Sequence, residues 1–201
     1  MRRAGAAARG KIFPPRHRPP HPLVSETPET PLVIQRATEA DATAIAELRL
    51  AVARELTAQF GRGTWSFVAE SELSVRAELR TSVLLIARDV QALVGTLRLS
   101  LRNPWLGDTN FFRAGTRPVF LTSMAIAPAR QRQGVGRALL AAAARTAREL
   151  GADAIRLDAY DAPAGAGEFY RKSGFREVRR GSYNGTRLIW FELGLASEAS
   201  G

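Results

Sequence analysis

The stretch RQRQGVGRALL, residues 130–140, places three arginines and two glycines directly before a run of alanine and leucine. It follows an almost wholly apolar run, VFLTSMAIAP at 119–128, which predicts a central strand. The two segments predict a strand, a glycine loop and a helix that ends near Leu150, with Gly151 after its last turn. The start of such a helix presents unpaired N–H groups and the positive end of the helix dipole, so this unit is expected to bind a phosphate.

The residue types in the loop suit that ligand. Gly134 and Gly136 allow close approach to the backbone and permit positive φ. Arg130, Arg132 and Arg137 add positive charge, and an arginine can hold a phosphate with two hydrogen bonds. The stretch therefore predicts a cradle for a pyrophosphate.

Two common phosphate-binding motifs do not fit these residues. A nucleoside triphosphate loop needs lysine and then a hydroxyl residue after its last glycine, but here Gly136 is followed by Arg137 and Ala138. A dinucleotide fingerprint needs a third glycine at the position that Leu139 occupies. Another class of pyrophosphate ligand is therefore expected.

The motif resembles that of a known family. The segment from Gln131 to Gly136 matches the Gln/Arg-x-x-Gly-x-Gly/Ala signature of the GCN5-related N-acetyltransferases (GNAT), and the segment EFYRKSGF at 168–175 is similar to their Tyr-x-x-x-Gly-Phe hallmark. The two motifs occur in the order that the family has them. The resemblance covers residues 32–195 by the order of elements and residues 119–175 by motif.

The resemblance implies an enzyme that moves an acetyl group from acetyl-CoA to a primary amine by direct attack. The backbone of the strand segment Met124, Ala125 and Ile126 would pair with the pantetheine arm. Tyr170 would lie near the sulfur as the general acid that protonates the leaving thiolate. Backbone N–H groups would hold the pyrophosphate, and these belong to Arg132, Gln133, Gly134, Val135, Gly136 and Arg137.

The general base does not follow from the family pattern. Many members carry a glutamate on the strand before the loop, where this chain has Thr122 and Ser123, and the asparagine often found seven residues before the tyrosine is Pro163. Asp158, Glu168 or a water molecule could take this role. The rival interpretation of Asp158 is a solvated strand end or a contact with Arg156.

The remaining elements alternate along the chain. Their order predicts a mixed α/β or α+β domain over residues 32–195, and the resemblance implies a central mixed, mostly antiparallel sheet flanked by helices. In the strand at 92–102, Leu97, Leu99 and Leu101 alternate with polar residues, which is typical of a half-exposed strand. The other expected strands are 32–38, 83–89, 154–160, 175–183 and 186–195, and the other expected helices are 38–60, 71–81 and 164–174.

Both ends of the chain are expected to be disordered. Residues 1–31 form a basic, proline-rich segment without hydrophobic periodicity, and residues 196–201 form a short C-terminal tail. His17 and His21 lie in the first segment, where the prolines between them prevent a helical metal pair, so no metal site is expected. The domain itself then has no histidine that could act as a base.

Composition excludes several classes of protein. The absence of cysteine rules out disulfides, a thiolate zinc site and a cysteine nucleophile, and it fits a cytoplasmic location. No apolar run is long enough to cross a membrane. The net charge of +10 is densest in the N-terminal segment, and no recognition motif accompanies it, so specific nucleic-acid binding is not expected.

The acceptor stays open between a small-molecule amine and a protein or peptide amine, and a homodimer is possible. Rival functions are a catalytically silent acyl-CoA sensor and, less favoured, a nucleic-acid-binding protein that uses its basic tail. Several aromatic residues fall in loops where the family usually builds its acceptor pocket, although a place in the core is the favoured interpretation. These are Trp65, Phe67, Trp105, Phe111 and Phe112, and the carboxylates in the same loops are Glu70, Glu72 and Asp108.

Overall fold

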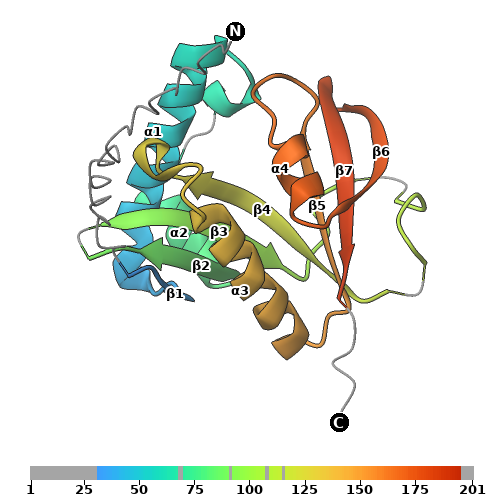
Figure 1. The fold of residues 1–201 in the computed structure, drawn as a ribbon, viewed down its shortest axis with the longest axis horizontal. Coiled ribbons are helices and arrows are strands. Elements are labelled where there is room, and N and C mark those ends of the chain that lie inside the picture. The colour runs from blue at the N-terminus through green and yellow to red at the C-terminus, as the bar shows by residue number, and fades with distance from the viewer. Residues whose placement is uncertain (1–30, 68–69, 91, 107–108, 115, 196–201) are drawn as a thin grey trace, which may run out of the picture.

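The computed structural model describes residues 31–67, 70–90, 92–106, 109–114 and 116–195 (Figure 1). The strands are β1 (Val33–Arg36), β2 (Val83–Arg88), β3 (Leu93–Ser100), β4 (Pro118–Ile126), β5 (Ala154–Tyr160), β6 (Arg176–Tyr183) and β7 (Thr186–Gly194). The helices are α1 (Ala42–Phe60), α2 (Glu72–Leu79), α3 (Val135–Glu149) and α4 (Gly167–Lys172). The predicted disordered tails, with His17 and His21, fall outside the described residues except for Pro31.

The described strands form one seven-stranded sheet in the order β1-β2-β3-β4-β5-β7-β6. Every neighbouring pair is antiparallel except β4 and β5, which are parallel. This parallel pair is short, because only Pro118–Phe120 of β4 pairs with Ala154–Arg156 of β5. The predicted mixed, mostly antiparallel sheet flanked by helices is confirmed, and its two central strands separate after Phe120.

Helices cover both faces of the sheet, as the alternation of side chains along β2 shows. Leu84 and Ile86 belong to a buried cluster with residues of α1 and α2. Leu85 and Ala87 belong to a second cluster, with residues of α3 and Tyr170 of α4. The helices α1 and α2 therefore lie on one face, and α3 and α4 lie on the other (Figure 1).

A strand is present in the region predicted at 92–102, but the prediction that it is half exposed is wrong. β3 ends at Ser100, and its polar residues Thr96 and Ser100 are buried, whereas Leu101 beyond its end is 66% exposed. The strand lies inside the sheet between β2 and β4, with helices on both faces. In such a position the residues of both faces are buried, so alternation in the sequence does not report which face meets solvent.

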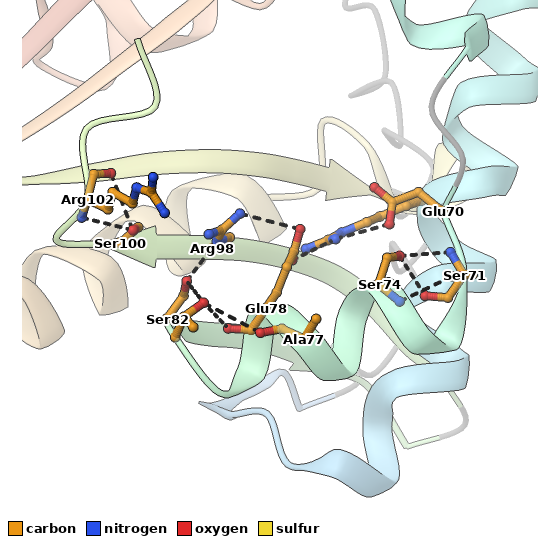
Figure 2. A network of polar contacts seen from close by, with 11 residues as sticks. Glu70, Ser71, Ser74, Ala77, Glu78, Ser82, Arg98, Ser100 and Arg102 are labelled. Atoms are coloured by element: carbon orange, nitrogen blue, oxygen red, sulfur yellow. Dashed lines mark hydrogen bonds and ion pairs between the residues drawn. The ribbon is translucent and has the colours of Figure 1, made fainter. Parts of the chain in front are cut away.

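A partly buried ion-pair network fastens α1 to α2 and the sheet (Figure 2). Arg49 of α1 is 5% exposed and donates to Glu70 at 3.2 Å and to Glu78 of α2 at 3.0 Å. Glu78 also pairs with Arg98 of β3 at 3.5 Å, and Arg98 donates to the hydroxyl of Ser82 at 2.8 Å. The network fixes α1 against the sheet, and the later turns of this helix form one wall of the site described below.

Candidate active site

A cavity of about 1050 Å³ opens where β4 and β5 separate. Its walls include residues 121–126 of β4 and 158–160 of β5, together with the C-terminal half of α1, the loop before α3, the start of α3, and α4. Since α1 and α3 lie on opposite faces of the sheet, the cavity reaches both faces through the gap between the two strands. A ligand in this gap can be approached from two sides.

A bulge in β4 faces this cavity. Arg98 of β3 lies opposite Thr122, and Thr96 lies opposite Ala125, so β4 holds one extra residue between these two pairs. Ser123, inside the bulge, has a φ of 51°. The bulge interrupts the ladder with β3, and no pairing with β5 extends to this part of β4. The backbone beside the cavity is therefore available to a ligand that carries amide groups.

The loop predicted to bind phosphate adopts the expected turn before α3. Gly134 caps the helix with a φ of 85°, a conformation that strains any residue with a Cβ atom. Arg132 also has a positive φ, 62°. The side chain of Gln133 donates to the carbonyl of Ala129 at 2.8 Å, which ties the loop to itself. Gln133 can therefore serve a ligand through its backbone, while its side chain stabilises the loop.

Gly136 does not have the positive φ that a glycine at this position would permit. It lies in the first turn of α3, and its φ is not among the positive ones. A Cβ atom at this position would lie 3.0 Å from Cζ of Phe169 and 3.5 Å from Cε of Met124. The glycine is explained by the close packing of Phe169 of α4 against α3 beside the cavity.

The three arginines of the loop divide into two groups. Arg130 forms an ion pair with Asp89 and is not among the residues that line the cavity, so its contribution to a phosphate site stays a prediction. Arg132 and Arg137 are exposed, line the cavity and have no side-chain partner within the described ranges. Lys172 of α4 lines the same region. The cavity therefore has a positively charged mouth on the α3 face of the sheet.

Tyr170 joins the core by its ring and the cavity by its hydroxyl. The ring packs edge-on against Phe175, and the whole residue is 6% exposed. The hydroxyl donates to Sδ of Met124 at 3.6 Å, and both residues are among those that line the cavity. Burial raises the pKa of Tyr170, and the nearby charge of Asp158 raises it further. The hydroxyl therefore keeps its proton at neutral pH and can act as a donor.

Asp158 is not the solvated strand end of the rival interpretation. Its Oδ1 accepts a hydrogen bond of 2.7 Å from Nε1 of Trp105, and its side chain lines the cavity. Arg156 turns instead to Glu192, to which it donates at 2.9 Å. Burial raises the pKa of Asp158, and the Trp105 hydrogen bond opposes that rise. A carboxyl group with a raised pKa is a better proton acceptor than an ordinary one.

Glu168, the other candidate base, has a different environment. It is exposed and forms ion pairs with Lys172 at 3.2 Å and with Arg171 at 3.4 Å. The contact with Lys172 lowers the pKa of Glu168 most, and the contact with Arg171 lowers it further. A stabilised surface carboxylate is the weaker base, so the geometry favours Asp158.

Sequence reasoning missed several residues of the cavity wall. Tyr160 follows Asp158 by two positions, which puts both on one face of β5, and this spacing could have identified it. Its ring packs edge-on against Trp65 at 5.2 Å between centroids. Glu55 and Gln59 reach the cavity from α1 at the i, i+4 spacing of one helix face.

The residues expected near an acceptor pocket are mostly placed elsewhere. Trp105 and Phe112 belong to a buried cluster with Phe120, against which Phe111 packs, so these aromatic residues are core, as favoured. Of the carboxylates, Glu70 forms an ion pair with Arg49. Glu72 forms an ion pair with Arg76 and accepts a hydrogen bond from Thr43. Neither carboxylate is among the residues that line the cavity. Asp108 and the side chain of Phe67 fall outside the described residues.

The described residues include neither a candidate metal centre nor a candidate membrane-spanning helix. None of the groups of His, Cys, Asp or Glu in this part of the chain has three members arranged to hold a metal ion. None of the helices in it combines the length and apolar character that a bilayer-spanning helix needs.

Comparison with solved structures shows the same fold in acetyltransferases. A putative acetyltransferase from Salmonella typhimurium, solved with its cofactor acetyl-CoA, has a TM-score of 0.61 at 18% identity, over 84% of this chain and 96% of that one. The ribosomal-protein-S18-alanine N-acetyltransferase from Escherichia coli has a TM-score of 0.60 at 16% identity, over 84% and 97%. An aminoglycoside 6'-acetyltransferase type Ii has a TM-score of 0.61 at 15% identity, over 83% and 99%.

Comparison by sequence agrees with the fold. No curated protein sequence matched the chain. A sequence model of the acetyltransferase (GNAT) family matches residues 49–175, which is more than half of the chain and spans the cavity walls from α1 to α4. The chain therefore belongs to the acetyltransferase (GNAT) family.

Proposed function

We propose that the chain transfers the acetyl group of acetyl-CoA directly to a primary amine. The single observation that carries this proposal is the cavity in the gap between β4 and β5. It has the glycine loop and the start of α3 on one face of the sheet and Asp158 with Tyr160 on the other. A thioester held in such a gap would meet its acceptor from the face opposite the cofactor.

The donor half of the site follows from the backbone. The segment of β4 at Met124, Ala125 and Ile126, which does not pair with β5, would pair with the amides of the pantetheine arm. The Gln131 side chain, which donates to the Ile126 carbonyl at 3.3 Å, would have to yield this oxygen to the ligand if the arm uses it. The N–H groups from Arg132 to Arg137 would hold the pyrophosphate, because they combine a positive-φ turn with the start of a fifteen-residue helix. The exposed guanidinium groups of Arg132 and Arg137 would add charge at the mouth.

The reaction would need one proton acceptor and one proton donor. Asp158 would accept a proton from the ammonium group of the acceptor, directly or through water, and the neutral amine would then attack the carbonyl carbon of the thioester. The C–N bond forms, and a backbone N–H near Met124 would stabilise the oxyanion. The C–S bond then breaks, and Tyr170 would give its proton to the departing sulfur. The nitrogen loses its second proton as the amide forms, and this proton would pass, through water, to the Tyr170 oxygen, so that the neutral phenol is restored.

The acceptor class rests on the wall that α1 provides. Glu55 and Gln59, which are hydrogen-bonded to each other at 2.7 Å, add a carboxylate and an amide to the cavity that Asp158 and Tyr160 also line. Carboxylates attract a cationic amine and stabilise its charged form, so Asp158 would have to remove a proton before the amine could attack. One neighbouring structure is named for a ribosomal-protein alanine and another for an aminoglycoside, so a protein amine and a small-molecule amine both stay open. The cytoplasmic location and the possible homodimer stay predictions.

Two linked measurements test the proposal. The melting temperature of the full chain is measured alone and with acetyl-CoA, CoA, ATP or NAD. A ligand at about 100 times its Kd stabilises by roughly 2.7 kcal/mol, which corresponds to roughly 5 to 10 °C for a domain of this size. Release of CoA is then followed with a peptide that begins with alanine and with an aminoglycoside. A shift with the CoA compounds alone, followed by acetylation of an amine, is expected.

The rival functions give different results. Stabilisation by acetyl-CoA without transfer to any amine would contradict catalysis and favour a sensor domain. No stabilisation by acetyl-CoA or CoA would contradict the cofactor assignment. Steeply salt-dependent DNA binding that is lost when residues 1–31 are removed would support the nucleic-acid alternative.

A further inference from the structure

We propose that Trp105 is a positioning residue for acetyl transfer, because its indole N–H holds one oxygen of Asp158 and leaves the other oxygen for the acceptor amine. The inference rests on the proposed function of the same site. It concerns a side chain from the segment between β3 and β4, which does not itself line the cavity.

The hydrogen bond between the two side chains is short and directional. Nε1 of Trp105 lies 2.7 Å from Oδ1 of Asp158. Within the described ranges, Oδ2 of Asp158 has no hydrogen-bond partner. An indole has a single N–H and no acceptor, so it can bind only one carboxylate oxygen. The second oxygen of a side chain that lines the cavity is thereby left to receive a proton.

Packing keeps the indole in place. Trp105 is 7% exposed and stacks on Phe112, with 5.4 Å between ring centroids and 20° between ring planes. Phe120 meets the same indole edge-on at 5.5 Å. Phe120 is also the last β4 residue that pairs with β5. The indole is therefore fixed at the point where the two strands separate and the cavity begins.

The backbone around Trp105 is fastened as well. The N–H of Trp105 donates to Oδ1 of Asn103 at 2.9 Å. The N–H of Leu106 donates to the hydroxyl of Tyr183 on β6, also at 2.9 Å. The segment before β4 is thus held to the far edge of the sheet. A donor fixed at both ring and backbone restricts the rotation of the carboxylate it holds.

The other ionisable groups near Asp158 do not form a hydrogen bond or an ion pair with its carboxylate in the described residues. Tyr170 from α4 is buried and Tyr160 from β5 is half-buried, and burial raises the pKa of both phenols, so neither carries charge at neutral pH. Arg156, two residues before Asp158 on β5, forms an ion pair with Glu192, which Arg176 also contacts. Trp105 is therefore the direct polar contact of this carboxylate in the described part of the chain. The remaining charged side chains of the cavity are Glu55 on α1, Arg132 and Arg137 at the start of α3, and Glu168 and Lys172 on α4.

The first test replaces the donor and keeps the ring. Trp105→Phe preserves an aromatic side chain between Phe112 and Phe120 but removes the hydrogen bond that stabilises ionised Asp158. The acid limb of the pH profile of kcat/KM should move to higher pH by about one unit, and kcat should fall about ten-fold. An acetyl-CoA assay with the best amine of the two-acceptor set gives both values.

A matched variant separates this effect from loss of packing. Trp190→Phe removes an indole from the same aromatic cluster, and the Nε1 of Trp190 is buried without a partner in the described residues. It should leave the acid limb where the wild-type chain has it. An acid limb that is unmoved in Trp105→Phe, or moved equally in both variants, would overturn the proposal.

The second test needs neither activity nor a variant of Trp105. The chain has three tryptophans, so its ¹⁵N-labelled form gives few indole N–H signals. The signal of Trp105 should shift with pH as Asp158 titrates, and this shift should vanish in Asp158→Asn. A Trp105 signal that is unmoved between about pH 4 and about pH 8 would contradict the hydrogen bond.

The two tests fail differently. If the wild-type chain acetylates no amine, the proposed function falls, and the positioning role falls with it. The NMR titration still decides whether Trp105 holds Asp158. If amines are acetylated but the indole signal does not respond to Asp158, the proposed function survives and only the role of Trp105 is lost.

Discussion

Asp158 and Tyr170 line one cavity from opposite faces of the sheet. Asp158 lies opposite Trp190 in the β5–β7 ladder, and Trp190 packs in the aromatic cluster with Trp105. Tyr170 packs in the other cluster, with Phe191 and the residues of α3. The gap between β4 and β5 lets the two side chains reach the same space. In the proposed reaction, the thioester would lie between Asp158 as the proton acceptor and Tyr170 as the proton donor.

The first prediction concerns the donor. Tyr170→Phe removes the hydroxyl but keeps the ring contacts with Phe175 and Phe191. Turnover should fall roughly 100-fold, since the thiolate must leave without a proton. The affinity for CoA should stay within a few-fold, and the melting temperature should change little, because a thioether is a weak acceptor. Unchanged turnover from about pH 6 to about pH 9 would refute the general-acid role.

The second prediction concerns the acceptor of the proton. Burial raises the pKa of Asp158, so at pH values below it the carboxyl group is protonated and cannot take a proton from the amine. Activity should therefore fall as the pH drops through this pKa. Asp158→Asn should lower kcat/KM by roughly 100-fold or more and remove that limb of the profile.

Glu168→Gln provides the matched control. This substitution also removes one carboxylate from the cavity wall, but from an exposed side chain that is paired with Lys172. It should leave turnover within about three-fold of the wild-type value, because exposed ion pairs contribute little. Equal losses in the two variants would contradict the assignment of the base to Asp158.

The third prediction separates the two glycines of the loop. Gly134→Ala meets open space but puts a Cβ atom on a residue with a φ of 85°, so the free energy of unfolding should fall by about 1 to 2 kcal/mol. Gly136→Val places atoms against Phe169, whose Cζ would already lie 3.0 Å from a Cβ atom. It should displace this ring and weaken CoA binding at least ten-fold.

Calorimetric titration with CoA and thermal unfolding measure the two effects. Gly151→Ala is the control for the strain at Gly134, because Gly151 also has a positive φ, 75°, and open space, but lies after the far end of α3. It should cost similar stability and leave CoA affinity unchanged. Undiminished CoA binding in Gly136→Val would show that the pyrophosphate lies elsewhere.

Local patterns in the sequence predict the parts of the site that are local in the structure. The strand, turn and helix around Gly134 depend on residues close in sequence, since a positive φ and a helix start are set by neighbours. Asp158 and Tyr160 share a strand face for the same reason. The resemblance adds the mostly antiparallel sheet around them.

Contacts between distant segments could not be predicted in this way. Trp105 and Asp158 are 53 positions apart, and the ion pair of Arg130 with Asp89 spans 41 positions. Nothing in the local pattern of either segment names its partner. The separation of β4 from β5 likewise depends on how the two strands pair, and neither strand's sequence predicts it. Thr96 is buried because helices cover both faces of β3, which the sequence of β3 alone does not show.

The last prediction concerns the ion-pair network that holds α1. This helix provides the cavity wall where the acceptor amine is proposed to bind. Arg49 has only 4% of its side chain exposed and faces Glu70 and Glu78, so Arg49→Ala leaves two partly buried carboxylates without their shared cation. Breaking a buried pair in this way typically costs about 3 to 5 kcal/mol. Urea unfolding should show a loss of roughly this size, against less than about 0.5 kcal/mol for the exposed Arg145→Ala of α3. Because the same helix carries Glu55 and Gln59, Arg49→Ala should also raise the KM for the amine more than that for acetyl-CoA. A loss below about 1 kcal/mol would mean that the network is replaceable by water and does not fix the wall.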